Sequence, residues 1–418
     1  MSKQVYIVDG LRTAIGNFGG TLSTIRPDDM AAHVIKNLIA KHPNFDPKQI
    51  EDILFGCANQ AGEDNRNVAR MAGLLSGLPI EIGGETINRL CASGMAATIN
   101  AARSIKDGAG EVYISGGVEN MTRGPWVISK ASTPFGRDSE MHDSSFGWRF
   151  INPQMTELYG TDGMGNTAEN LAEMYSIDRE SQDSFAAWSQ EKTSKAQALG
   201  RFEEEIIAVN IPQRKKEDII FTKDEFARNG TTMESLGGLR PAFKKEGGTV
   251  TAGNASGLND GAAALLIASE DAVKSNNFKP LARIVAGAVA GVEPRIMGIG
   301  PVFAAEKALK RSGLTLGQMD IIEVNEAFAA QTLSNVKMFA SDKFAKEKLG
   351  RDKAIGDIDM DKFNVMGSSL AYGHPFAATG TRMITQMLNE LNRRGGGTGL
   401  LTACAAGGLG AAMIVETE

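Results

Sequence analysis

Apolar residues follow two different spacings that alternate along the first 120 residues of the chain. Short runs of consecutive apolar residues predict buried strands at 5–8, 50–56 and 112–118. Apolar residues at helical spacing, or runs of small residues, predict helices at 28–40, 67–76 and 94–108. Strands that alternate with helices in this way predict a mostly parallel, doubly wound sheet.

This alternation is interrupted between residues 126 and 258 and then resumes. The interrupted segment is polar and irregular, with helices predicted at 167–175 and 179–199. Beyond a core-like strand at 259–270, the pattern predicts helices at 302–311, 327–338 and 376–392, and strands at 320–324, 399–403 and 411–415. We therefore expect an N-terminal half (1–125 plus 259–279), an inserted loop domain (126–258) and a C-terminal half (280–418).

The two regular parts of the chain resemble each other in the order of their elements. Helix 94–108, strand 112–115 and a Gly-Gly pair are matched by helix 380–395, strand 399–403 and a second Gly-Gly pair. This echo predicts two similar α/β halves that pack together, with the insertion over one face. In such a duplicated fold, Cys91 and His374 would begin corresponding helices whose tips converge.

Charge and composition exclude several classes of function. A net charge of −6 provides no basic footprint for nucleic acid. No apolar run approaches the roughly 20 residues that a membrane-spanning helix needs. Three cysteines, with no close Cys–Cys or Cys–His pair, argue against disulfides and against a metal site. The N-terminus enters a strand without a signal segment, so we expect a cytoplasmic protein.

Four reactive or polar side chains lie at the ends of predicted elements. Cys91 begins a helix, whose dipole and free N–H groups favour a thiolate near neutral pH. His374 precedes another helix, Cys404 lies at a strand end before a glycine-rich turn, and Asn325 follows a buried strand. Each also has a purely structural interpretation, as a buried cysteine, a packing histidine or a capping asparagine. Together they favour covalent acyl transfer over redox chemistry, and no dinucleotide or P-loop motif is present.

The chain resembles the thiolase family over essentially its whole length. The resemblance rests on nine motifs in order: 12–20, Asn88–Gly94, Met164–Glu169, Leu239–Phe243, Thr251–Gly261, Met297–Pro301, Asn325–Phe328, Gly373–Pro375 and the turn after Cys404. It implies the thiolase fold, an α/β fold of two similar α-β-α-β-α layered halves with an inserted loop domain.

The resemblance also implies a role for each candidate residue. Cys91 takes the acyl group, His374 activates it, and Cys404 is the acid and base that handles the acetyl-CoA α-carbon and the thiol of CoA. Asn325 holds a water that stabilises the thioester enolate oxygen together with His374. The backbone N–H groups of Cys91 and Ala406 form the other oxyanion hole.

Contacts to coenzyme A are implied in the same way. The residues around the nucleotide and pantetheine are Arg228, Ser235, Phe243, Ala252 and Ser256, and the acyl end is lined by Met164, Met297 and Phe328. Coenzyme A is then a co-substrate, and no permanently bound cofactor is expected.

Three positions depart from the family pattern. Ala406 replaces a glycine, and an alanine is strained if the turn requires positive φ. The motifs around His374 and Cys404 resemble the thiolase subunit of fatty-acid-oxidation complexes, a branch that tends to have histidine in place of Asn325. Gly163 occupies a place where many members have histidine.

The function expected from the resemblance is thiolytic cleavage of 3-oxoacyl-CoA in fatty-acid β-oxidation. Three alternatives stay open: condensation of two acetyl-CoA molecules, a non-catalytic acyl-CoA-binding or lipid-binding protein, and a structural subunit of an oxidation complex. Family kinship implies a homodimer or homotetramer, with a hydratase–dehydrogenase chain as a further candidate partner. Residues 126–160 would set the acyl-chain specificity.

Overall fold

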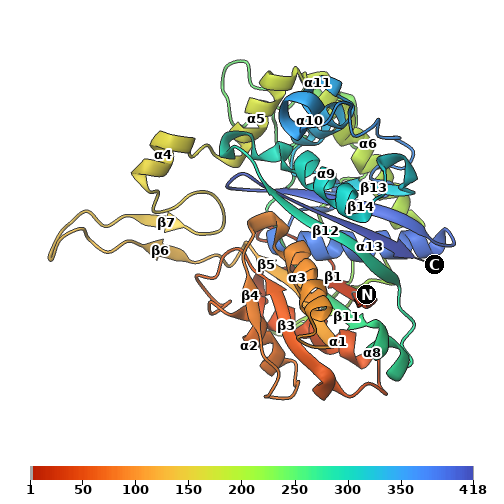
Figure 1. Cartoon of the computed structure of the whole chain (residues 1–418). Coiled ribbons are helices and arrows are strands. Elements are labelled where there is room, and N and C mark those ends of the chain that lie inside the picture. Colours follow the sequence, from red (N-terminus) through yellow and green to blue (C-terminus); the bar gives the residue numbers. More distant parts are fainter. Residues whose placement is uncertain (1–2, 418) are drawn as a thin grey trace.

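A computed structural model describes residues 3–417, in which helices and strands form stacked layers (Figure 1). The main strands are β1 (Val5–Thr13), β2 (Gly16–Asn17), β3 (Ile50–Gly56), β4 (Glu85–Ile87), β5 (Val112–Asn120), β8 (Ile206–Ile207), β11 (Asn259–Ser269), β12 (Ala282–Gly291), β13 (Ile321–Val324), β14 (Gly397–Ala405) and β15 (Leu409–Thr417). Within the described residues they form one sheet of 11 strands. Its main order is β13-β14-β15-β12-β1-β11-β5-β3-β4, and the short strands β2 and β8 pair with β11 and β1. The helices that cover this sheet are α1 (Pro27–Ala40), α2 (Val68–Leu75), α3 (Ser93–Asp107), α8 (Glu270–Ser275), α9 (Gly300–Ser312), α10 (Ala329–Phe339) and α13 (Phe376–Arg393).

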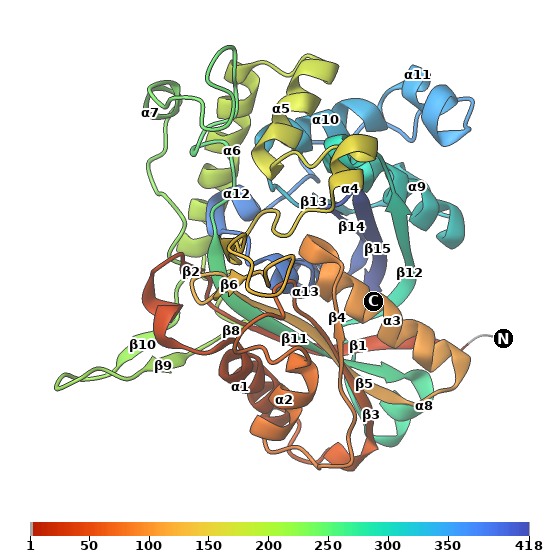
Figure 2. The same cartoon turned by 90° about the vertical axis from the view of Figure 1, so that its left-hand side faces the viewer.

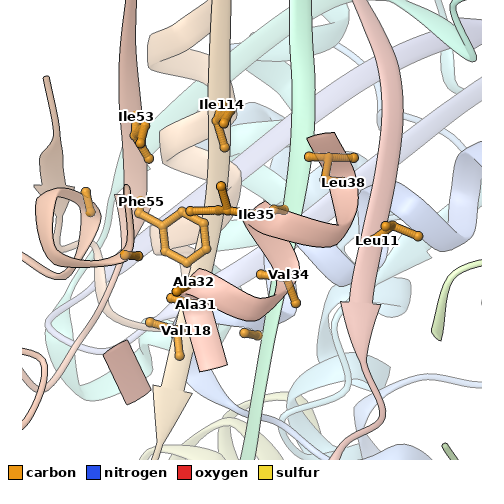
Figure 3. Close-up of a cluster of buried hydrophobic side chains, with 14 of the residues drawn as sticks. Leu11, Ala31, Ala32, Val34, Ile35, Leu38, Ile53, Phe55, Ile114 and Val118 are labelled. Atoms are coloured by element: carbon orange, nitrogen blue, oxygen red, sulfur yellow. The ribbon is translucent and has the colours of Figure 1, made fainter. Parts of the chain in front are cut away.

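The N-terminal part of the sheet is buried on both faces because successive side chains point to opposite sides. On β11, Ala264 and Leu266 face the cluster formed with α1 and α2, whereas Leu265 and Ile267 face the cluster formed with α3 and α13. Figure 3 shows the first cluster, where α1 lays Ile35 and its apolar neighbours over the sheet.

The C-terminal part of the sheet shares the central helices and has its own outer layer. Leu401 and Met413 face α3 and α13, and Leu400 and Ile414 face the cluster formed with α9 and α10. The molecule therefore has five layers: outer helices, the N-terminal part of the sheet, the central helices α3 and α13, the C-terminal part of the sheet, and a second set of outer helices. This arrangement confirms the expected layering of the thiolase fold.

The two parts of the sheet also repeat one pattern of strand directions. β3 is parallel to β5, β5 antiparallel to β11, and β11 antiparallel to β1. β13, β14, β15 and β12 have the same directions in the same order. The parts join where β1 pairs with β12 at Tyr6–Arg283 and Ile7–Ala282. The echo seen in the sequence is therefore a structural duplication.

The prediction of a mostly parallel sheet is wrong. The long insertion between β5 and β11, and the tight turn between β14 and β15, both return the chain antiparallel to the strand before. In that turn Gly407 and Gly408 have φ of 76° and 85°, a conformation that glycine adopts without steric cost.

Residues 126–258 contain more regular structure than the sequence indicated. The expected helices are α5 (Met164–Tyr175) and α6 (Arg179–Ala198). In addition there are helices α4 (Pro153–Tyr159) and α7 (Met233–Gly237), a hairpin of β6 (Trp126–Ile128) and β7 (Met141–Asp143), and a hairpin of β9 (Val209–Ile211) and β10 (Ile219–Phe221). Both hairpins extend away from the layered body (Figures 1 and 2). The three-part domain division stays a prediction.

Candidate active site

Cys91 lies in a tight turn between the edge strand β4 and helix α3. The turn is a single 3₁₀ turn (Leu90–Ala92), and Leu90 has φ of 48°, a left-handed conformation that is strained for leucine. Asn88 holds the turn, because its Oδ1 accepts from the Leu90 N–H at 3.0 Å and its Nδ2 donates to Ala58 O at 3.0 Å. Ser93 Oγ donates to Leu90 O at 2.6 Å. The sequence therefore fixes the thiol in one position just before the helix.

The Cys91 thiol is protonated in the free protein. Its side chain is buried, and burial raises the pKa of Cys91 to about 12, although the backbone N–H of Ala406 lowers it in part. The nearby Glu119 carboxylate raises it further. The expected thiolate near neutral pH is therefore wrong, because desolvation outweighs the helix terminus here. A nucleophilic role for this sulfur therefore requires a base that accepts its proton.

Cys404 lies near the end of β14, close enough to Cys91 for the two thiols to interact electrostatically. The thiol is fully buried, and both burial and the proximity of Cys91 raise its pKa well above the ordinary range. The turn that follows assigns positive φ to Gly407 and Gly408 and not to Ala406. Ala406 therefore donates its N–H toward Cys91 without backbone strain, so alanine at this position is compatible with the turn.

His374 precedes α13 and is held at its backbone and at one ring nitrogen. Its N–H donates to Asn259 Oδ1 at 2.9 Å, and its Nδ1 is 2.6 Å from Thr379 Oγ1. Gly373 has φ of 97°, and a Cβ there would lie 2.5 Å from the Asn259 side chain. Burial lowers the pKa of His374 to about 3, so the imidazole is neutral. Its Nε2 is buried without a hydrogen-bond partner among residues 3–417.

Asn325 follows β13 and leaves one polar atom unpaired. Its backbone N–H donates to Thr402 O at 2.9 Å, which ties it to the strand that carries Cys404. Its Oδ1 accepts from Ser369 Oγ at 2.6 Å, whereas its Nδ2 is buried and has no partner in the described part of the chain. A buried amide nitrogen of this kind is costly unless it serves a ligand or water.

Glycines bring the starts of the two central helices together. A Cβ at Gly94 of α3 would lie 2.4 Å from Thr381 Oγ1 and 2.5 Å from Ala377 O of α13. A Cβ at Gly117, near the end of β5, would lie 2.0 Å from the same carbonyl oxygen. No other residue type permits this approach, which places the segment after His374 against the Cys91 turn.

Comparison with known proteins agrees with this geometry. The sequence matches the family description "Thiolase, N-terminal domain" over residues 5–271 and "Thiolase, C-terminal domain" over 278–417. The chain belongs to the thiolase family. Cys91 lies in the N-terminal match, and His374 and Cys404 lie in the C-terminal one, so the candidate site joins both domains.

Curated relatives match this thiolase from end to end. It is 48% identical to a beta-ketoadipyl-CoA thiolase of Acinetobacter baylyi and 49% identical to a 3-oxoadipyl-CoA/3-oxo-5,6-dehydrosuberyl-CoA thiolase of Escherichia coli K12, covering 99% of each chain in both comparisons. Among solved structures, human mitochondrial 3-ketoacyl-CoA thiolase is similar, with a TM-score of 0.88 at 38% identity over 100% of this chain and 99% of the other.

The residues expected at the acyl end of the thiolase site share one apolar cluster with Cys404. Met297 and Phe328 are buried in this cluster, and Met164 packs against it from the start of α5. The ring of Phe243 meets that of Phe328 edge to face at 6.2 Å. The structure therefore brings these side chains together, while their roles stay predictions.

The remaining residues expected to contact coenzyme A lie at or near the surface. Arg228 and Ala252 are exposed, and the Arg228 guanidinium lies 5.0 Å from the Phe226 ring. Ser235 is also exposed and forms a capping box at the start of α7 with the N-cap residue Thr232. Ser256 is half-buried, and its N–H donates to Ala327 O at 2.9 Å. These contacts to coenzyme A stay predictions.

The sequence analysis missed Glu119, a buried carboxylate that supports the site. Glu119 accepts from the backbone N–H groups of Ala58, Asn59 and Ala377, at 3.0, 3.1 and 3.3 Å, and so joins the Cys91 side to α13. Burial raises its pKa to about 7. Its position at the carboxyl end of β5 was a usable signal, because ligand sites of α/β folds gather at strand ends.

Residues 3–417 contain neither a metal-binding cluster nor a helix that could span a membrane. No group of three or more histidine, cysteine, aspartate or glutamate side chains is placed to hold a metal ion. None of the helices in this range combines the length and apolar character needed to cross a membrane.

Proposed function

We propose that this thiolase cleaves a 3-oxoacyl-CoA with the thiol of coenzyme A, through an acyl group carried on Cys91. We further propose that the acyl chain is a six-carbon dicarboxylic one, so that 3-oxoadipyl-CoA yields acetyl-CoA and succinyl-CoA. The names of the relatives support this acyl chain in place of the fatty-acid substrate expected from the sequence. The cytoplasmic location and the homodimer or homotetramer stay predictions of the proposal.

The first half of the reaction depends on which groups of the site can accept and donate protons. His374 Nε2, neutral and unpaired, accepts the proton of the Cys91 thiol as the sulfur attacks the 3-keto carbon. The backbone N–H groups of Cys91 and Ala406 stabilise the resulting oxyanion. The C2–C3 bond then breaks, and Cys404 protonates the α-carbon of the departing acetyl-CoA enolate.

The second half returns the site to its starting state. The Cys404 thiolate removes the proton of the incoming coenzyme A thiol, which attacks the acyl group on Cys91. Collapse of the tetrahedral intermediate releases the shortened acyl-CoA, and His374 returns the proton to Cys91. In the first half, Asn325 Nδ2 holds a water that stabilises the thioester enolate oxygen together with the protonated Nε2 of His374.

One observation carries this proposal. Two buried thiols lie near enough to interact electrostatically, a backbone N–H is directed at one of them, and two buried nitrogens near the same elements lack partners among the described residues. A protein that only binds acyl-CoA gains nothing from burying such groups unpaired, because each costs about 1–3 kcal/mol. A catalytic site uses them when charge develops on the substrate.

The test compares substrates of one length that differ in the distal carboxylate. We expect kcat/KM for thiolysis of 3-oxoadipyl-CoA to exceed that of 3-oxohexanoyl-CoA by about tenfold or more, since a site built for a polar group rejects the analogue without it. Equal or faster cleavage of 3-oxohexanoyl-CoA, or of 3-oxohexadecanoyl-CoA, would overturn the dicarboxylic assignment. Cleavage of none of them would overturn thiolysis.

A further inference from the structure

The amide of Asn325 has one orientation, and a buried arginine on α13 sets it. The proposed role of Asn325 requires its Nδ2 to face the reacting groups, yet an amide is nearly symmetric in shape and can point either way. Its carbonyl oxygen is held by Ser369 at 2.6 Å. The Ser369 hydroxyl alone does not fix the orientation of the amide, because it can donate to Oδ1 or accept from Nδ2.

Arg382 removes this ambiguity. Its Nη2 donates to Ser369 Oγ at 3.0 Å, and a guanidinium has no acceptor to offer in return. The hydroxyl hydrogen is thereby directed away from the cation and toward Asn325 Oδ1. The cation also polarises the O–H bond and favours the negative end of the amide dipole on its side. A flipped amide would leave the hydroxyl hydrogen without its acceptor.

The arginine is itself rigidly held. Its side chain is fully buried, and its Nη1 donates to Glu323 Oε1 at 3.1 Å and to Gln386 Oε1 at 2.8 Å. The guanidinium carbon lies 4.7 Å from the centre of the Tyr372 ring. Glu323 lies on β13, two positions before Asn325, which directly follows the strand, so the counter-ion and the amide are close along the chain.

We propose that Arg382 and Ser369 are positioning residues that hold the Asn325 amide with its N–H groups toward the reacting atoms. The inference rests on the proposed function of Asn325 and deepens it. A buried ion pair is seldom retained for stability alone, since apolar residues of similar volume are often at least as stabilising. The Arg382–Ser369–Asn325 chain gives this buried charge a catalytic purpose.

Ser368 provides a matched control. It is a neighbouring serine and equally buried, but its hydroxyl donates to Glu323 Oε1 at 3.0 Å and forms no hydrogen bond with Asn325 within the described residues. We expect Ser369→Ala to lower kcat for thiolysis by about tenfold with KM unchanged, whereas Ser368→Ala stays within about twofold of the unaltered chain.

A double substitution separates positioning from loss of structure. If Ser369 acts only through Asn325, the variant that combines Ser369→Ala with Asn325→Ala is no slower than Asn325→Ala alone. Arg382→Lys is expected to resemble Ser369→Ala, because one ammonium group cannot serve Ser369, Glu323 and Gln386 in the same geometry.

Two results would overturn the inference while the unaltered chain remains active. One is an unchanged kcat for Ser369→Ala, and the other is a double variant whose losses multiply. Failure of the proposed function is distinguishable, since it shows as absence of thiolysis by the unaltered chain.

Discussion

The backbone N–H of Ala406 is directed at the sulfur of Cys91, although the two residues belong to opposite halves of the duplicated fold. This contact depends on the close packing of α3 against α13 and on the glycine turn after β14. The proposed nucleophile and its proposed oxyanion donor therefore depend on the assembled fold, and neither half provides both.

Replacement of Cys91 by alanine is expected to abolish the covalent acyl intermediate, because the proposed mechanism places the acyl group on the Cys91 sulfur and uses Cys404 only to transfer protons. Intact-mass analysis after incubation with 3-oxoadipyl-CoA would show an added acyl group on the unaltered chain and none on Cys91→Ala. Cys57→Ala is the control, since Cys57 is buried beside Asp64, to whose Oδ2 its sulfur donates at 3.9 Å, and has no role in the mechanism. An adduct on the Cys91→Ala variant would contradict the scheme.

The pH dependence of Cys91 alkylation follows from its raised pKa. Because a pKa of about 12 leaves the thiol protonated, the reactive thiolate fraction grows tenfold with each pH unit through the neutral range. We expect the rate of iodoacetamide labelling of the free protein to rise from pH 6 to 9 without a plateau, after subtraction of the rate of Cys91→Ala. A plateau beginning below about pH 7 would mean that a thiolate already exists there.

Gly94→Ala tests the contact between the central helices. The added methyl group would overlap Thr381 and the Ala377 carbonyl, so we expect a loss of about 1–3 kcal/mol in the free energy of unfolding, together with a lower kcat. Gly317→Ala is the control, because no heavy atom lies within 4 Å of a Cβ built there. Urea unfolding of both variants measures the difference, and equal midpoints would argue against a tight helix contact.

Glu119 makes stability depend on pH. Its folded pKa of about 7 lies above the ordinary value of 4.5, so the folded protein binds more protons than the unfolded chain between these values. The free energy of unfolding therefore falls as the pH rises through this window, by about 1.4 kcal/mol per unit at most from this group. Glu119→Gln should flatten the decline measured by urea unfolding from pH 5 to 7.5.

Glu323 and Asp260 have pKa values raised in the same direction, to about 7 and about 6, so part of the decline remains in that variant. A slope that is unchanged by Glu119→Gln would show that Glu119 titrates in its ordinary range.

Much of the local structure could be predicted from the sequence. The periodic segment 28–40 became α1 (Pro27–Ala40), and the apolar run at 50–56 became β3. Such elements follow from residue spacing and from glycine positions, which act over a few residues. The nine motifs, taken in order along the chain, also sufficed to indicate the family.

Charge states, strand directions and supporting contacts were decided only by the tertiary structure. Burial reversed the expected ionisation of Cys91, because desolvation depends on groups from distant segments that exclude water. The antiparallel strands depend on how the insertion and the final turn return the chain. Ser369 and Arg382 carried no signal of their own, since each acts only through a neighbour that folding brings beside it.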